Sequence, residues 1–485
     1  MTAETSTPTE PNRWAVLALL GVAQLMVVLD ATIVNIALPS AQKALHFSTD
    51  SRQWIITAYA LAFGSLLLLG GKLGDLFGRK WTFIAGLVGF SIASAIGGLA
   101  TSFATLVAAR ALQGLFGALL APSALSLLTV TFADSPDRAK AFGIFGAIAG
   151  GGASLGLLLG GALTQTLSWR WCLYVNLAIA VPTAIVALRL LVNQAHPQRP
   201  KIDVPGVLVA SAGLFGLVYG FSNAETHSWT APVTIIALAA SIVLLTAFVV
   251  IERRTAQPLL PLHIVTDRAR GGAYASIALA GSGVFGVFLF LTYFMQQNLG
   301  FSPLTTGLAF LPMTGMIVVT ATTVQTKVLD KTGPKPLIVL GMTFGIVAMV
   351  LFTRLTSGGS YATEVLPGLL VIGFGMGCIF APAFGTATLG VDRQEAGIAS
   401  AMVNTSQQVG GSVGTALLST LFASSAAGYA ASHRVLPAVA MVHGYTTAFW
   451  WAAGIFAVGL LVAVLVLPGR IGPARPAVEA ALATE

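Results

Sequence analysis

Apolar residues fill most of this chain in long stretches that short polar connections separate. The first stretch runs from Trp14 to Pro39, and each later one contains about 18 residues or more. The later stretches lie near 53–71, 81–100, 105–132, 139–164, 170–191, 204–222, 230–251, 271–296, 304–327, 336–355, 365–388, 397–424 and 441–467. Because about 20 apolar residues cross a bilayer as a helix, the pattern predicts fourteen spans in an all-α membrane protein.

Composition agrees with a protein that lies in the membrane. Hydrophobic residues make up 56% of the chain and charged residues 9%, with a mean hydropathy of +0.85, whereas soluble domains have roughly 25% charged residues. The first stretch is longer than a signal-peptide core and lacks an obvious cleavage site. We therefore expect it to be retained as the first helix, and we expect no large soluble domain.

The basic residues predict the orientation of the chain. They are scattered singly, so the net charge of +8 does not indicate nucleic-acid binding. Of the 25 Lys and Arg residues, one lies inside a span and five lie in connections on the side opposite the termini, namely Lys43, Arg52, Arg170, Arg354 and Arg434. The remainder lie on the side of the termini. Because loops rich in Lys and Arg lie on the cytoplasmic side of a membrane, both termini are predicted to be cytoplasmic.

A repeated loop predicts an internal duplication. The connection after the second span reads GKLGDLFGRK, and the one after the tenth reads TKVLDKTGPK. At one constant offset, Asp75 matches Asp330, Gly78 matches Gly333 and Lys80 matches Lys335. Both loops follow the second helix of a six-helix unit, as a parallel duplication requires. Coincidence is the alternative interpretation, because turns of this type are common.

These loops belong to a larger set of motifs. The segment LDATIVNIALP, from Leu29 to Pro39, the loop from Gly71 to Lys80, and R-x-x-Q-G-x-x-G-A from Arg110 to Ala118 occur in order, followed by 169–176 and by GFSPLTTGLAFLP at 300–312. Together they resemble the major facilitator superfamily, and within it the fourteen-helix drug:proton antiporters. The resemblance covers nearly the whole chain.

The resemblance implies a domain organisation. It predicts the major facilitator fold, with six-helix bundles at 13–191 and 271–467 that rock about a site near the midplane. Two inserted transmembrane helices at 204–251 are expected to pack outside the bundles. The segments 1–12 and 468–485 are expected to be cytoplasmic tails.

One acidic residue lies where charge is costly. Of the 17 Asp and Glu residues, Asp30 is alone in lying well inside a predicted span, where a carboxylate costs about 2.5–3.5 kcal/mol on insertion scales. Arg110 lies at a similar depth in the fourth span, in the motif that the resemblance links to proton coupling. Our hypothesis is that Asp30 accepts the driving proton and that Arg110 favours its charged form. A purely structural ion pair is the alternative.

Glycines in the fifth span suggest a close helix contact. Gly152, Gly156 and Gly160 recur every fourth residue, with Gly161 beside the last, so they form a flat stripe. We expect this stripe at the interface between the bundles, either as a gating surface or as a static packing face. Leu157 stands where related exporters usually have proline.

The first signature loop is expected to hold the cytoplasmic helix ends. Asp75 with Arg79 and Lys80 would form a conformational latch, a role that the resemblance implies, while Gly74 and Gly78 permit tight turns. Solvated loop charge is the alternative. The loop residues predicted to act in gating are Gly71, Gly74, Asp75, Gly78, Arg79 and Lys80.

A pocket for apolar molecules is predicted from aromatic and amide side chains. Its candidate residues are Trp54, Tyr59, Phe63, Gln113, Tyr293, Gln296, Gln297, Asn404 and Gln407. Aromatic rings attract lipophilic cations, although aromatic residues of membrane helices also face lipid or pack internally. Because Asp30 is the single buried negative charge expected, we predict neutral or monocationic substrates.

Several other chemistries are excluded or disfavoured. No phosphate-binding G-x-x-x-x-G-K-[ST] motif occurs. The six His residues lie in loops or at helix edges, and Cys172 and Cys378 stand alone. We therefore expect no enzyme activity, no cofactor and no metal. The predicted function is proton-driven efflux by a monomer; an exporter of one endogenous metabolite or self-made antibiotic is the alternative, ahead of a membrane-embedded enzyme or sensor.

Overall fold

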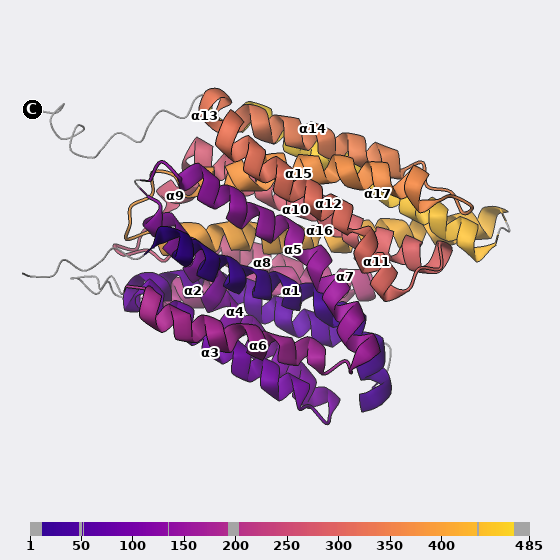
Figure 1. Ribbon diagram of the computed structural model, residues 1–485, viewed down its shortest axis with the longest axis horizontal. Coiled ribbons are helices and arrows are strands. Elements are labelled where there is room, and N and C mark those ends of the chain that lie inside the picture. Colours follow the sequence, from indigo (N-terminus) through magenta and orange to yellow (C-terminus); the bar gives the residue numbers. More distant parts are fainter. Residues whose placement is uncertain are drawn as a thin grey trace, which may run out of the picture.

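The chain folds into long helices that confirm the fourteen predicted spans. The computed structural model describes residues 12–47, 51, 53–133, 135–192, 203–433 and 436–469, so the predicted tails fall almost entirely outside it. Within these ranges, fourteen helices are long and apolar enough to cross a membrane. They lie side by side along the long axis of the molecule (Figure 1).

The helices form two halves and an inserted pair. The first half consists of α1 (Arg13–Leu45), α2 (Gln53–Phe77), α3 (Arg79–Gly98), α4 (Phe103–Thr131), α5 (Arg138–Thr166) and α6 (Trp171–Leu190). The inserted pair is α7 (Val204–Thr226) and α8 (Pro232–Glu252). The second half consists of the short α9 (Leu262–Thr266), then α10 (Arg268–Tyr293) with η2 (Phe294–Asn298), α11 (Pro303–Ala309), α12 (Leu311–Thr323) with η3 (Val324–Val328) and α13 (Leu329–Thr332), α14 (Pro334–Phe352), η4 (Tyr361–Val365) with α15 (Leu366–Ala387), α16 (Ala396–His433) and α17 (Pro437–Val466).

The two halves meet along a few helices. In the first half α2 and α3 pack on α4, and α1 packs on α5 and α6. Across the interface, α5 packs on α11, α12 and α15, while α2 and α4 pack on α16. An even number of spans places the start of α1 and the end of α17 on one face, which we call the terminal face (left in Figure 1).

Small residues allow the helices to approach closely. A methyl group on Gly114 of α4 would lie 2.9 Å from the Ala62 side chain and from the Phe63 backbone nitrogen of α2. A methyl group on Gly71 of α2 would lie 2.6 Å from the Gly397 carbonyl oxygen of α16. Lipid offers no hydrophobic drive for helix association, so close packing of this kind supplies much of the stability.

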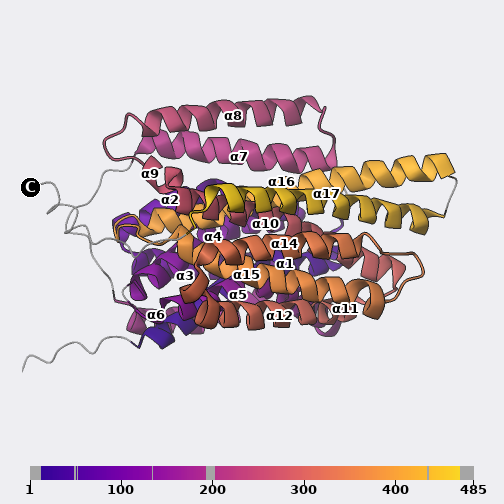
Figure 2. The same cartoon turned by 90° about the horizontal axis from the view of Figure 1, so that it is seen from above.

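The inserted helices lie outside both halves. The helix α7 packs on α2 and α16, and α8 packs on α7, so the pair stands at one edge of the molecule (Figure 2). The apolar side chains of Ile235, Ile236, Ile242 and Val243 on α8 are exposed. A helix with such an apolar surface is suited to contact lipid.

The two signature loops have equivalent geometry. Gly78 and Gly333 both have positive φ, at 93° and 75°, a conformation that only glycine adopts freely. The Lys80 Nζ donates to the Leu188 carbonyl at 2.8 Å near the end of α6, and the Lys335 Nζ donates to the Val464 carbonyl at 2.7 Å near the end of α17. Equivalent contacts at the ends of both halves agree with a duplication.

The last two helices extend further than the apolar pattern predicts. The predicted span 397–424 continues as α16 to His433, and α17 begins at Pro437. At about 1.5 Å per residue, the 38 residues of α16 measure roughly 57 Å, so the α16–α17 hairpin projects at the face opposite the termini (Figure 2). The predicted span ends where polar residues such as Ser424 and Ser425 begin. In the structure these residues continue the helix α16.

Candidate functional site

A polar cluster lies inside the first half, around Asp30 of α1. Asp30 is fully buried and Arg110 of α4 is 2% exposed. The Arg110 Nη1 donates to Asp30 Oδ2 at 2.6 Å, an ion pair between two helices far apart in sequence. Asp30 and Arg110, which were predicted to lie at a similar depth in the membrane, therefore contact each other directly.

Three further polar side chains complete the cluster. Gln113 Nε2 and Asn176 Nδ2 donate to Asp30 Oδ1 at 2.9 and 2.7 Å. Both amides also donate to the Ser94 hydroxyl, at 2.7 and 3.3 Å. Gln113 Oε1 in turn accepts from Arg110 at 2.9 Å. Four helices, α1, α3, α4 and α6, thus contribute to one hydrogen-bonded network, which we call the Asp30 cluster.

The Arg110 guanidinium is held on its other sides as well. Its Nε donates to the Ile55 carbonyl of α2 at 3.3 Å, and its carbon lies 4.4 Å from the centre of the Tyr59 ring. The Tyr59 ring stacks on Phe63. A cation facing an aromatic ring gains electrostatic stabilisation, most strongly where water is excluded.

The Asp30 cluster contains one buried ion pair, between Asp30 and Arg110. Both Asp30 oxygens accept hydrogen bonds as a carboxylate would, and the buried pair is neutral overall. Protonation of Asp30 would remove the charge that pairs with Arg110.

Two members of the cluster were missed from the sequence. Asn176 was noted only as the end of a motif, and Ser94 of α3 was not singled out. An amide in the apolar sixth span is a signal that could have identified Asn176, because polar groups in spans face partners. The sequence offers no comparable signal for Ser94, because serine is frequent in membrane helices.

The signature loop connects the two halves at the terminal face. Asp75 Oδ1 and Oδ2 accept from the backbone nitrogens of Gly397 and Ile398, at 3.1 and 3.3 Å, at the start of α16. Arg79 donates to Asp75 Oδ1 at 2.8 Å and to the Arg393 carbonyl. A carboxylate at a helix N-terminus satisfies free N–H groups and favours the helix dipole. We call this set of contacts the Asp75 latch.

The loop glycines and Lys80 have different roles. Lys80 binds the end of α6, within the first half, rather than α16. Gly78 turns the chain as predicted, whereas Gly74 lies inside α2 without a positive φ. A methyl group on Gly74 would lie 3.5 Å from the Ser123 hydroxyl of α4, so Gly74 serves helix packing and the prediction of a turn there is wrong.

Replacing Asp75 with Ala is expected to weaken the latch. The change removes the cap of α16, worth about 1 kcal/mol, and it leaves the buried Arg79 without its carboxylate. The thermal unfolding midpoint of the purified protein should therefore fall. Asp75→Asn keeps a capping oxygen and should fall less; an unchanged midpoint for Asp75→Ala would contradict the latch.

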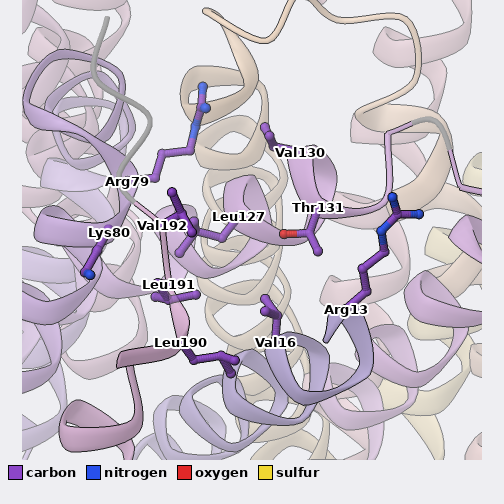
Figure 3. Close-up of a pocket in the computed structure, with 10 residues that line it drawn as sticks. All are labelled: Arg13, Val16, Arg79, Lys80, Leu127, Val130, Thr131, Leu190, Leu191 and Val192. Carbon is purple, nitrogen blue, oxygen red and sulfur yellow. The ribbon is translucent and has the colours of Figure 1, made fainter. Parts of the chain in front are cut away.

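A cavity of about 210 Å³ opens near the latch, on the terminal face (Figure 3). Its walls come from the ends of α1, α3, α4 and α6, with Arg13, Arg79 and Lys80 among apolar side chains. Val16 lines this cavity, whereas Asp30 lies fourteen residues further along α1, roughly 21 Å away by helical rise. The cavity is therefore distinct from the Asp30 cluster.

The glycine stripe of α5 faces α1, which corrects the prediction of an interface between halves. Methyl groups on Gly152, Gly156 and Gly160 would approach within 3.0 Å of α1 atoms, including the Val28 side chain and the Ile33 carbonyl. Without proline at Leu157, α5 is one uninterrupted helix.

Other glycines of α5 form the contact between the halves. Gly146 lies against Ala381 of α15, and Gly161 lies against Leu304 of α11. The helix α5 therefore packs on α1 with one side and on the second half with the other, and it carries glycine on both sides. The sequence alone does not tell which glycines face which neighbour.

The predicted pocket residues of the first half are mostly buried. Tyr59, Phe63 and Gln113 lie in the interior. Gln113 was predicted to line the pocket, but it belongs to the Asp30 cluster. Trp54 is 45% exposed, and its ring lies 6.2 Å from that of Tyr219 on α7. Trp54 thus faces the inserted pair.

The predicted pocket residues of the second half lie on α10, η2 and α16. Tyr293 and Gln297 are exposed, Gln296 and Gln407 are half-buried, and Asn404 is buried, donating to the Ser400 carbonyl. The helix α16, which carries Asn404 and Gln407, packs on both α2 and α10.

The described residues contain no group of three His, Cys, Asp or Glu side chains arranged to hold a metal ion. The two cysteines are free and buried.

Comparison with known proteins decides the family. Residues 20–415 match the sequence model of the Major Facilitator Superfamily. The chain belongs to the Major Facilitator Superfamily. This superfamily consists of membrane transporters, so the chain is a multi-pass membrane protein.

Individual relatives of this major facilitator protein carry names that refer to antibiotics. It is 45% identical to the puromycin resistance protein pur8 of Streptomyces alboniger, over 96% of both chains. It is 38% identical to the cephamycin export protein CmcT of Amycolatopsis lactamdurans, over 88% of this chain and 87% of that protein. Its fold matches the human organic anion transporter MFSD10, with a TM-score of 0.63 at 16% identity, over 93% of this chain and all of the other.

Proposed function

We propose that this protein exports lipophilic neutral or monocationic small molecules across the cell membrane in exchange for protons, and so confers drug or antibiotic resistance. The observation that carries the proposal is the 45% identity, over nearly the full length of both chains, to a protein named for puromycin resistance. The export protein for cephamycin supports the direction of transport.

Proton coupling would occur at the Asp30 cluster. In this proposal, a proton from outside neutralises Asp30, weakens its pairing with Arg110 and favours rearrangement of α1 and α4. The halves would rock about the contacts of α5 and α2 with the second half, with the Asp75 latch closed in one state and open in the other. Loss of the proton to the cytoplasm would reset the transporter, which we propose acts as a monomer.

The orientation follows from the distribution of charge. We place the terminal face in the cytoplasm because it collects most of the 25 basic residues. The Asp75 latch would then be a cytoplasmic gate. In the substrate site, Trp54, Tyr293, Gln296, Gln297 and Gln407 are at least partly accessible, while Tyr59 and Phe63 would have to become exposed.

The site is expected to prefer monovalent over divalent lipophilic cations. Asp30 is the one carboxylate among the proposed proton-coupling and substrate residues, and Asn404 and Gln407 of α16 are uncharged, so a second positive charge would find no partner. Efflux of matched monovalent and divalent dyes from the same cells measures this preference. Equal efflux of both would contradict it.

The function is tested by dye efflux from cells that express the chain, with and without a protonophore. We expect efflux that the protonophore abolishes; efflux that persists after the proton gradient collapses would overturn proton coupling. The second candidate function is export of one endogenous metabolite or self-made antibiotic, which the name of the cephamycin relative favours. A protein that reaches the membrane and moves no dye would support that alternative.

A further inference from the structure

Two carboxyl groups meet at the terminal face, where the inserted helices α7 and α8 come together. Asp203 caps α7, and its Oδ1 accepts from the Gly206 backbone nitrogen at 3.0 Å. Glu252 ends α8, and its Oε2 accepts from the Leu260 backbone nitrogen at 2.9 Å. The two residues are 7% and 4% exposed, so neither carboxyl group is solvated as a surface residue would be.

The second oxygen of each group has no hydrogen-bond donor. Asp203 Oδ2 and Glu252 Oε1 are both buried without a partner. A methyl group on Gly206 would contact both of these oxygens, so the two unpaired oxygens lie beside the same point of α7. Ionised carboxylates only accept hydrogen bonds, so two of them facing each other repel, whereas one shared proton satisfies both oxygens.

Nearby charges do not supply that missing donor. Arg253 and Arg254 follow Glu252 and are exposed. Lys72 of α2 donates to the Pro258 carbonyl at 3.0 Å. His263 of α9 contacts Glu395, before α16, at 3.0 Å. None of these described groups is bonded to Asp203 Oδ2 or Glu252 Oε1.

The pair positions a segment that contacts both halves. The connection 253–261 follows Glu252, and its residues Leu259 and Leu260 are buried in the apolar core. Lys72 binds this connection to α2 beside the contact of Gly71 with α16, and α9 continues it to Glu395. A change at Glu252 is therefore transmitted to the place where the halves close.

We propose that Asp203 and Glu252 form a second proton-binding site, separate from the Asp30 cluster, which holds the connection 253–261 against α2 while one proton is shared between them. The proton comes from the aqueous phase at the terminal face and bridges Asp203 Oδ2 and Glu252 Oε1, which changes the charge of the pair from −2 to −1. As the pH rises the proton is lost, the carboxylates repel, and the connection separates from the core. The site thereby makes closure of the terminal face sensitive to pH on that side.

The test uses a nitroxide spin label at an Ala256→Cys substitution in the full-length purified protein. Ala256 is exposed on the connection, and Cys172 and Cys378 are buried and poorly accessible to the label. Electron paramagnetic resonance spectra are recorded from about pH 5 to about pH 9. We expect the mobile fraction of the label to rise from about one-tenth to about nine-tenths over roughly two pH units.

Three variants decide the assignment. Glu252→Gln places a permanent N–H donor in the pair, so the label should stay immobile at all pH values. Asp203→Asn, which retains a capping oxygen, serves the same purpose should Glu252→Gln not fold. His263→Gln, the control for the neighbouring histidine, should keep the transition of the unmodified protein.

Other outcomes would overturn the proposal. A label that is equally mobile at every pH, a transition that persists in the amide variants, or one that follows sodium concentration rather than pH would each exclude a shared proton. The measurement does not involve transport, so its failure would leave the proposed export function untouched, and a failed efflux test would leave this site untouched.

Discussion

Replacing Asp30 with Asn is expected to reduce protonophore-sensitive dye efflux to the level of cells without the transporter. The amide remains close in shape to the carboxyl group, so Gln113 and Asn176 can still be accommodated. It cannot bind and release a proton, however, and the coupling step is lost. Efflux is measured in cells with matched amounts of membrane-inserted protein.

Reduced stability is the main competing explanation, because the change leaves Arg110 charged and buried. Removing one partner of a buried pair costs about 3–5 kcal/mol. The double variant Asp30→Asn with Arg110→Gln removes both charges, so it should recover stability but not efflux. Asp137→Asn, at an exposed carboxylate before α5, is the matched single control and should transport normally. Full proton-driven efflux by Asp30→Asn would exclude the coupling role.

Replacing Gly71 with Val is expected to abolish transport by preventing closure of the terminal face. A single methyl group there would lie 2.6 Å from the Gly397 carbonyl oxygen and 2.7 Å from the Ala401 side chain. Backbone of α16 cannot yield as a flexible side chain can, and a larger group would also displace the Asp75 latch. The halves should therefore stay apart at this face.

Spin labels on the two halves measure that separation. Positions 137 and 394 are exposed, one before α5 and one before α16, and cysteines there report the distance across the terminal face. We expect longer distances and background efflux for Gly71→Val. Gly385→Val is the matched control, since nothing lies within 4 Å of a methyl group at Gly385; it should resemble the unmodified protein. Normal distances with normal efflux for Gly71→Val would refute the role of this contact.

Much of the architecture was predictable because a bilayer imposes a simple rule on sequence. Spans must be apolar over about 20 residues, so the helix count could be read directly, and the offset between the Asp75 and Asp330 loops indicated a duplication. The same rule made Asp30 conspicuous, since a carboxylate inside a span needs a partner. Arg110 was predicted as that partner from its similar depth and from the motif in which it lies.

The membrane rule says nothing about which way a helix faces its neighbours. The glycines from Gly152 to Gly160 and the glycine at position 146 look alike in the sequence. In the structure the first group packs on α1, whereas Gly146 packs on α15. Likewise the sequence did not assign Asn176 and Ser94 to the Asp30 cluster, because those contacts join helices whose relative rotation depends on the whole bundle.

The sequence by itself therefore determined the number of helices and the buried charge at Asp30, and it predicted a duplication and an inserted pair. These properties follow from local hydrophobicity and from short motifs. The tertiary structure alone decided which residues complete the Asp30 cluster, that Asp75 caps α16, and that Asp203 and Glu252 both lie beside Gly206. These arrangements bring together side chains from helices far apart in sequence, and their geometry is fixed by close packing across many contacts at once.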